Sequence, residues 1–110
     1  MIFTEYYVIV NLLQNNETVL YKETKSAIGV SPVWNQPFLF DIKETDFTKY
    51  WIQCLVMQGK SYTKDGVIGQ ALVGPKTTVS GIQHWNDVMD SDSPEISKWH
   101  PLTSVGTACL

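Results

Sequence analysis

The sequence predicts an all-β protein, an antiparallel β-sandwich that carries one short helix near its end. Apolar runs of strand length, rich in β-branched and aromatic residues, recur along the chain with turn residues between them. Residues 31–42, SPVWNQPFLFDI, open with a proline turn and then alternate phenylalanine with Leu39 and Asp41, at the period of a strand. Only residues 80–89 repeat their apolar side chains at helical spacing.

The first half of the chain reads as a hairpin followed by an aromatic strand. Residues 6–13, YYVIVNLL, predict a strand that is mostly buried on both faces, and residues 17–24, ETVLYKET, predict its partner. The three amides of residues 14–16 form the turn, because asparagine tolerates left-handed backbone angles. Trp34 is large enough to fill one end of the sandwich, and residues 38–42 form a strand with aromatic side chains on its inner face.

The middle of the chain predicts two more strands. A charged connection at residues 43–49 takes a helical turn, and residues 50–57, YWIQCLVM, form an interior strand. Residues 58–65, QGKSYTKD, form a polar loop that turns sharply at Gly59. Another strand follows at residues 66–73.

The last third contains the helix and a closing strand. Ser80 is the expected helix cap, and Ile82, Trp85 and Met89 fall on one helical face. Residues 90–94 form a turn, and residues 96–102, ISKWHPL, form a closing strand that Pro101 restricts to an edge. Residues 103–110 are expected to be frayed.

Length, charge and cysteine usage limit the function. The 110 residues make one domain, and a net charge of −3 with a pI near 5.2 argues against a surface for nucleic acid or anionic lipid and favours a basic partner. Cys54 and Cys109 do not make a disulfide framework, which favours a reduced, cytoplasmic location. No apolar run has the length of a membrane span.

Five segments in order resemble the C2 domain of the synaptotagmin family, in particular its second C2 domain. They are SPVWNQPFLFDI, YWIQCLVM, GVIGQALVG, QHWNDVM and the closing WHPL of residues 99–102. The resemblance implies a Greek-key sandwich of eight strands, of which the first two are absent here. Residues 1–103 are therefore expected to form a partial C2 domain, with a flexible tail at residues 104–110. Missing strands expose sheet edges, so self-association through those edges is a further expectation.

The resemblance also implies where calcium would bind, because C2 domains hold Ca²⁺ with aspartates in the loops at one end of the sandwich. The matching positions hold Glu5, Gln58, Lys60 and Gly66, and Asp65 lies one residue out of register. Lys60 places a cation where the metal would sit. We therefore expect no calcium, no other metal and no cofactor.

Two other family surfaces have candidate residues. Lys60, Tyr62 and Lys64 could contact a membrane, although a solvated polar loop is the alternative interpretation. Only Lys22, with Lys25 just beyond it, remains of the lysine-rich strand with which the family binds acidic lipids and proteins. Ordinary surface charges are the favoured interpretation of both lysines, because a single lysine on a domain of net negative charge adds little affinity for an anionic surface.

The Trp-His-x-Leu ending matches the family best. The resemblance implies partner binding through Trp99, His100 and Leu102, with the tryptophan packed and the histidine at the surface. A strand that only closes the sandwich is the alternative, and one segment can serve both purposes.

An enzyme is the third interpretation. His84, Asp87 and His100 form a candidate acid–base or metal-binding set, but no phosphate loop, nucleophile elbow or HExxH pattern accompanies them. The function that we expect is a non-catalytic, calcium-independent C2 domain that scaffolds protein partners in membrane trafficking or exocytosis. The alternative is a peripheral module at the vesicle or plasma membrane that binds phospholipid without calcium.

Overall fold

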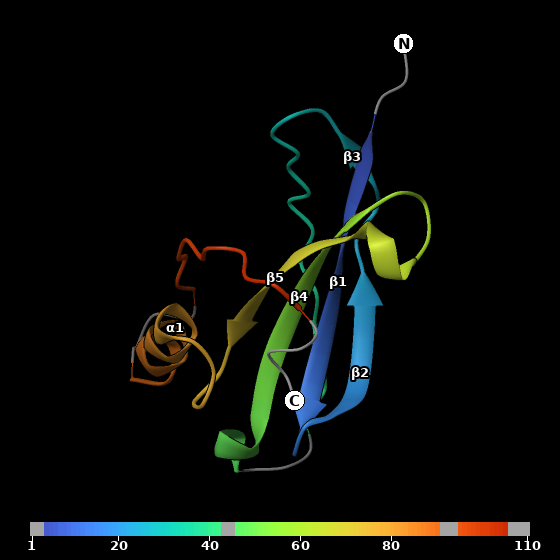
Figure 1. The fold of residues 1–110 in the computed structure, drawn as a ribbon. Helices are drawn as coiled ribbons and strands as arrows, with labels where there is room; N and C mark the ends of the chain where they lie inside the picture. Colours follow the sequence, from blue (N-terminus) through green and yellow to red (C-terminus); the bar gives the residue numbers. More distant parts are fainter. Residues whose placement is uncertain (1–3, 43–45, 91–94, 106–110) are drawn as a thin grey trace.

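An antiparallel sheet with strand order β2-β1-β4-β5 forms the centre of the molecule (Figure 1). The computed structural model describes residues 4–42, 46–90 and 95–105. The strands are β1 (Glu5–Gln14), β2 (Glu17–Glu23), β4 (Tyr50–Gln58) and β5 (Val67–Val73). The short β3 (Ala27–Ile28) pairs with the first residues of β1, beyond the end of β2. The predicted all-β antiparallel fold is confirmed.

The β1–β2 hairpin forms at the predicted turn. Asn15 and Asn16 have φ angles of 53° and 68°, in the left-handed region, and Gln14 pairs with Glu17 across them. Asparagine adopts these angles at lower cost than most residues, and two consecutive residues with positive φ match the twist of the flanking strands. The turn therefore fixes the register of β2 on β1.

The interior position predicted for β4 is also confirmed. β4 pairs with β1 in an unbroken register from Tyr6 opposite Gln58 to Gln14 opposite Tyr50, and with β5 on its other side. Met57 on this strand has none of its surface exposed. A strand with a neighbour on each side hydrogen-bonds through both edges, so β4 ties the sheet together.

Helix α1 (Val79–Asp90) packs next to β5 and confirms the predicted helix. Trp85 joins a core cluster with two buried sheet residues, Leu12 and Tyr50. Partly buried side chains complete this cluster: Phe40, Ile42, Ile52 and Val73. The helix carries Trp85 into the core at the end of the sheet where β4 begins.

Two details of the helix prediction are wrong. The cap is Thr78, whose Oγ1 accepts a hydrogen bond from the Gly81 amide at 3.1 Å, because the helix begins one residue before Ser80. Met89 is 46% exposed, so it does not share the buried face of Trp85. Gly81 is buried in its place, and a Cβ there would lie only 2.1 Å from the Leu72 carbonyl oxygen.

The strand predicted at residues 38–42 is wrong. Within the described chain these residues pair with no other strand, although Phe38, Phe40 and Ile42 are half-buried and Leu39 is 84% exposed. The alternation of a strand is therefore present without its ladder of hydrogen bonds. A side chain holds the segment instead, because the Lys22 ammonium group donates to the Leu39 carbonyl at 2.7 Å.

The closing strand predicted at residues 96–102 is likewise absent. The pairing described here is a single bridge, in which Thr103 and Gln70 exchange two hydrogen bonds of 2.9 Å. Pro101 has no N–H to donate, which removes one ladder hydrogen bond from this segment. Thr103 is thus paired where fraying was expected, and residues 106–110, with Cys109, lie outside the described residues.

Short helical turns precede β4 and β5. The turn expected before β4 is present as η1 (Phe47–Lys49), where Asp46 Oδ1 accepts from the Thr48 amide at 3.1 Å. Residues 43–45 of that connection lie outside the described residues, as do residues 91–94 of the predicted turn. The second turn, η2 (Lys64–Gly66), ends the loop that follows β4, and Gly59 in that loop has a φ of 112°, as its predicted turn requires.

Candidate functional site

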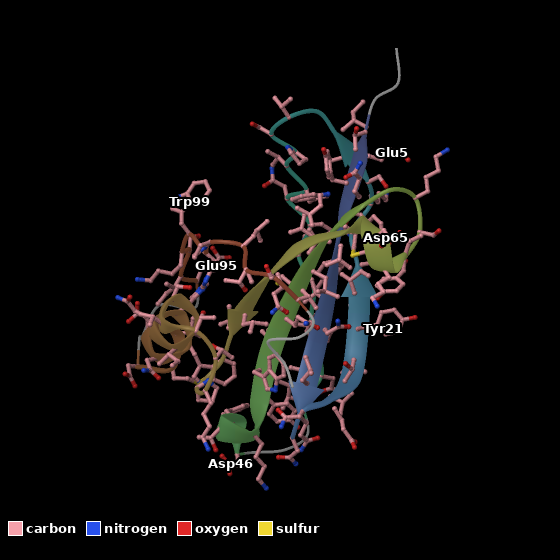
Figure 2. All side chains as sticks on the ribbon, viewed as in Figure 1. Glu5, Tyr21, Asp46, Asp65, Glu95 and Trp99 are labelled. Carbon is pink, nitrogen blue, oxygen red and sulfur yellow. The ribbon has the colours of Figure 1, made fainter. Side chains whose placement is uncertain are left out.

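Three of the four positions that match the calcium ligands lie together at one end of the sheet. The Gly59 amide donates to the Glu5 carbonyl at 2.9 Å, which joins the start of β1 to the end of β4 at Gln58. Gly66 also contacts Gln58, because a Cβ built on the glycine would lie 2.7 Å from the Gln58 carbonyl oxygen. Figure 2 shows Glu5 and Asp65 at this end, and Lys60 is exposed in the same loop.

The side chains at this end are poor ligands for Ca²⁺. The ion takes six to eight oxygens, whereas the four positions supply one carboxylate, one amide, one ammonium group and a glycine. Asp65 is exposed between Lys64 and Gly66 in η2. Among the residues that the structure describes, no three His, Cys, Asp or Glu side chains are grouped so as to hold a metal ion.

The loop residues proposed to touch a membrane are all exposed. Lys60, Tyr62 and Lys64 extend from the loop after β4, and Tyr62 is 61% exposed. A hollow of about 530 Å³ adjoins them, and it is lined by Tyr62, Lys64, Val67, Ile68, Gly69, Ser104 and Val105. Ser104 and Val105 form one wall of this hollow. The sequence did not predict that wall, because these two residues lie far from β5 along the chain.

Lys22 has a structural partner. Its Nζ donates to the Leu39 carbonyl at 2.7 Å and lies 5.5 Å from the centroid of the Phe40 ring. Lys25 is exposed, and its backbone amide donates to the Gln36 side chain at 2.9 Å. The Lys22 side chain therefore connects β2 to residues 39–40.

The Trp-His-x-Leu segment is oriented opposite to the expectation. Trp99 is 98% exposed, although it was expected to be packed, and His100 is half-buried, although it was expected at the surface. The imidazole of His100 makes two hydrogen bonds to α1, which hold this side of the segment inward. Leu102 is 48% exposed and lies against Gly69.

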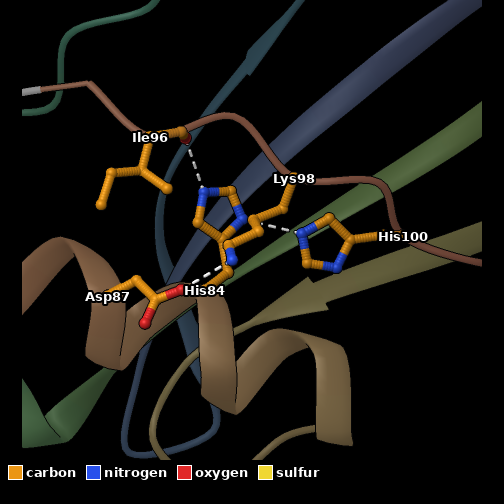
Figure 3. Close-up of polar contacts among 5 residues, drawn as sticks. All are labelled: His84, Asp87, Ile96, Lys98 and His100. Carbon is orange, nitrogen blue, oxygen red and sulfur yellow. Dashed lines mark hydrogen bonds and ion pairs between the residues drawn. The ribbon is translucent and has the colours of Figure 1, made fainter.

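The structure brings together the residues of the candidate acid–base set. His84 Nδ1 lies 2.7 Å from His100 Nε2, and Asp87 forms an ion pair of 2.7 Å with Lys98 (Figure 3). His84 Nε2 lies 2.9 Å from the Ile96 carbonyl oxygen, so the two rings form one hydrogen-bonded chain. Burial lowers the pKa of His100, and the charge of His84 is the second cause.

Ser80 belongs to this cluster, although the sequence indicated only a helix cap. Its Oγ lies 3.0 Å from His100 Nδ1. A serine and a histidine in contact resemble part of a nucleophilic site, but catalysis also needs donors placed for a developing oxyanion. The hydrogen bonds of the two rings join α1 to the C-terminal segment.

The opposite end of the sheet has a cleft that the sequence did not reveal. Its volume is about 520 Å³, and the β1–β2 turn and the connections flanking β4 and β5 form it. It is lined by Asn15, Asn16, Asp46, Thr48, Lys49, Tyr50, Trp51, Leu72, Pro75, Lys76 and Thr77. The lining mixes charged side chains, Asp46, Lys49 and Lys76, with the aromatic Tyr50 and Trp51.

Cys54 is a half-buried free thiol. Burial raises its pKa, so the reactive thiolate is disfavoured. None of the described helices is long and apolar enough to cross a membrane.

Comparisons with known proteins agree with this geometry. The family model described as "C2 domain" matches residues 3–101. The chain is 32% identical to synaptotagmin-11 of Mus musculus over 99 residues, which are 88% of this chain and 23% of that protein. It is 28% identical to synaptotagmin-1 of Pongo abelii over 97 residues, 87% of this chain and 23% of the relative. The chain thus spans less than a quarter of the length of these relatives. With its five-stranded antiparallel sheet, its loops at one end and a family match over most of its length, the chain belongs to the C2 domain family.

Proposed function

We propose that this chain is a calcium-independent, non-catalytic C2 module that binds protein partners in membrane trafficking. The observation that carries the proposal is the loop end where Gly66 lies against Gln58 and Lys60 is exposed between them in the sequence. An ammonium group repels a divalent cation, and a glutamine amide is a weaker ligand than a carboxylate. The relatives, which are synaptotagmins, support the setting in trafficking and a peripheral, cytoplasmic location.

Packing at Gly66 also opposes a calcium site. A Cβ on this residue would lie 2.7 Å from both the Gln58 carbonyl oxygen and the Thr63 hydroxyl. Contacts of that length force the backbone to move, so an aspartate at position 66 does not fit the present loop. The chain therefore departs from a calcium site in shape as well as in charge.

Calorimetric titration with calcium tests this proposal. We expect no saturable heat up to about 1 mM Ca²⁺, the upper end of the range for weak extracellular calcium sites. The Gln58→Asp/Lys60→Asp variant supplies two carboxylates at the same end and serves as the sensitised control. Saturable binding to the unmodified chain at micromolar calcium would contradict the proposal.

Trp99 supports a protein-binding role. An almost fully exposed tryptophan, with Leu102 three residues later at 48% exposure, is the kind of anchor that dominates protein interfaces. The net charge of −3 favours a basic partner over an acidic surface.

The second candidate function is calcium-independent phospholipid binding. The exposed Lys60, Tyr62 and Lys64 beside the apolar hollow favour it. Each lysine contributes about 1 kcal/mol near an anionic membrane, which is little for a domain of net negative charge. Salt distinguishes the two functions, since lipid binding through lysines weakens as ionic strength rises.

A partner can also be a second copy of the chain. Within residues 4–42, 46–90 and 95–105, no strand pairs with the outer edge of β2. Val19, Leu20 and Tyr21 on this strand are exposed. Edge strands of this composition add to other strands, so we propose that β2 supports self-association.

A further inference from the structure

The histidine pair joins two elements that are distant in the sequence. His84 lies on α1, and His100 lies in the C-terminal segment that carries Trp99 and Leu102 (Figure 3). The ring centroids are 5.0 Å apart and the ring planes differ by 20°. Ser80, one turn before His84 on the helix, contacts the other nitrogen of His100 at 3.0 Å.

The partners of these rings determine which nitrogen carries each proton. The Ile96 carbonyl can only accept, so His84 Nε2 donates to it at 2.9 Å. In a neutral ring His84 Nδ1 then has no proton, and it accepts from His100 Nε2 at 2.7 Å. His100 Nδ1 is in turn bare and accepts from the Ser80 hydroxyl. All three hydrogen bonds run in one direction when both rings are neutral.

This arrangement can hold one additional proton but not two. A first proton fits on His100 Nδ1 if the Ser80 hydroxyl rotates and accepts. A second proton would place N–H groups on both nitrogens of the 2.7 Å contact. Two donors and two positive charges at that distance repel each other, so the rings must separate.

The surrounding charges do not remove this conflict. Asp87 on α1 is already paired with Lys98 of the C-terminal segment, which leaves little net charge near the rings. Asp90 is the other acidic residue of α1, and Glu95 precedes Ile96 and has interactions of its own. The strand on which α1 packs, β5, has no titratable side chain in its sequence VIGQALV.

We propose that Ser80, His84 and His100 form a pH-sensitive latch that fixes residues 95–103 on α1 and thereby sets the position of Trp99. The latch is closed while the rings share at most one additional proton and opens when the second proton binds. This inference deepens the proposed function and rests on it in one respect, since Trp99 is the proposed docking residue.

The direction of the pH dependence follows from the lowered pKa of His100. In the detached or unfolded segment His100 binds a proton near the ordinary histidine pKa of 6.5. At that pH the closed segment binds fewer protons, because its His100 pKa is lowered. The contact is therefore fully formed above that pH and weakens as the pH falls through and below it.

Amide hydrogen exchange of the 110-residue chain tests the latch. The Thr103 amide, which donates to the Gln70 carbonyl at 2.9 Å, reports on attachment of the segment. We expect its protection factor to fall at least about tenfold between about pH 7.5 and about pH 5. The Thr24 amide, which donates to Val8 at 2.9 Å far from the histidines, is the internal control and should keep its protection.

Two variants separate the latch from simple packing. His84→Asn keeps an acceptor near the position of Nδ1 but leaves a single titratable ring, so the fall in protection at Thr103 should shrink to the part that burial of His100 alone causes. Ser80→Ala removes the acceptor for the first proton, so opening should move to higher pH. A flat Thr103 profile in the unmodified chain, or an unchanged fall in His84→Asn, would overturn the proposal.

The ring nitrogens provide a test that does not depend on variants. Nitrogen-15 shifts should show both neutral rings protonated at Nε2, and two proton-binding steps separated by more than about one pH unit, as coupled sites require. A neutral ring protonated at Nδ1 would contradict the latch. These measurements involve no calcium, lipid or partner, so failure of the latch leaves the calcium titration of the proposed function unaffected.

Discussion

Gly81 shows how closely single residues control the packing of α1. A Cβ at this position would lie 2.1 Å from the Leu72 carbonyl oxygen and 2.4 Å from the Thr77 hydroxyl. Although alanine favours helices by about 1 kcal/mol, we expect Gly81→Ala to lower the free energy of unfolding by about 1–3 kcal/mol. Urea unfolding measures the change.

The control for Gly81→Ala is Gln83→Ala, at an exposed position of the same helix. This change should alter stability by less than about 0.5 kcal/mol. If Gly81→Ala were as stable as the original chain, α1 could not approach β5 as closely as the structure shows.

The orientation of Trp99 and His100 marks a limit of prediction at the scale of residues. Neighbours in an extended segment point to opposite sides, so the sequence predicts that one of the two faces inward. Which one does depends on Ser80 and His84, residues of a different element. We expected Trp99 to be buried because it is the larger aromatic residue. The hydrogen bonds of His100 to α1 turn the histidine inward and leave Trp99 exposed.

At the scale of elements, prediction succeeded where the determining contacts are local. The β1–β2 turn follows from two asparagines, and β4 and α1 follow from hydrophobic periodicity. Residues 38–42 have the same kind of alternation, but ladder pairing needs a neighbouring strand that periodicity alone does not specify. The same reason explains the absence of a strand at residues 96–102.

The free edge of β2 gives a prediction at this scale. Light scattering across a tenfold dilution should show the apparent mass falling toward that of the monomer, because edge pairing is bimolecular. Val19→Lys places a charge on the exposed edge and should keep the chain monomeric throughout.

The matched control for the edge is Val79→Lys, at the exposed start of α1, which should behave like the original chain. A compact monomer at every concentration of the original chain would rule out self-association through β2. The boundaries expected for the domain and its tail, residues 1–103 and 104–110, stay a prediction.

For the whole molecule, the sequence predicted the fold class and the C2 resemblance, and the fold and family comparisons support both. The positions Glu5, Gln58 and Gly66 do lie together at one end, because the β1–β4 register brings Glu5 close to Gln58 and the loop before β5 returns Gly66 to Gln58. The histidine–serine cluster and the cleft lined by Trp51 and Lys76 were not predicted as such. Both are formed by residues far apart in the sequence: α1 and the C-terminal segment form the cluster, and the β1–β2 turn with the connections flanking β4 and β5 forms the cleft.

Sedimentation with phosphatidylserine vesicles, in calcium and in chelator, is the most direct test of calcium-independent function. We expect the chain to remain in the supernatant in both conditions. The Lys60→Asp variant, which removes the charge that repels calcium, is measured beside it. Pelleting in both conditions that is lost in high salt and in Lys60→Asp would favour the phospholipid alternative. Pelleting of the original chain only with calcium would contradict the account, because the metal would then bind where Gln58, Lys60 and Gly66 leave no site for it.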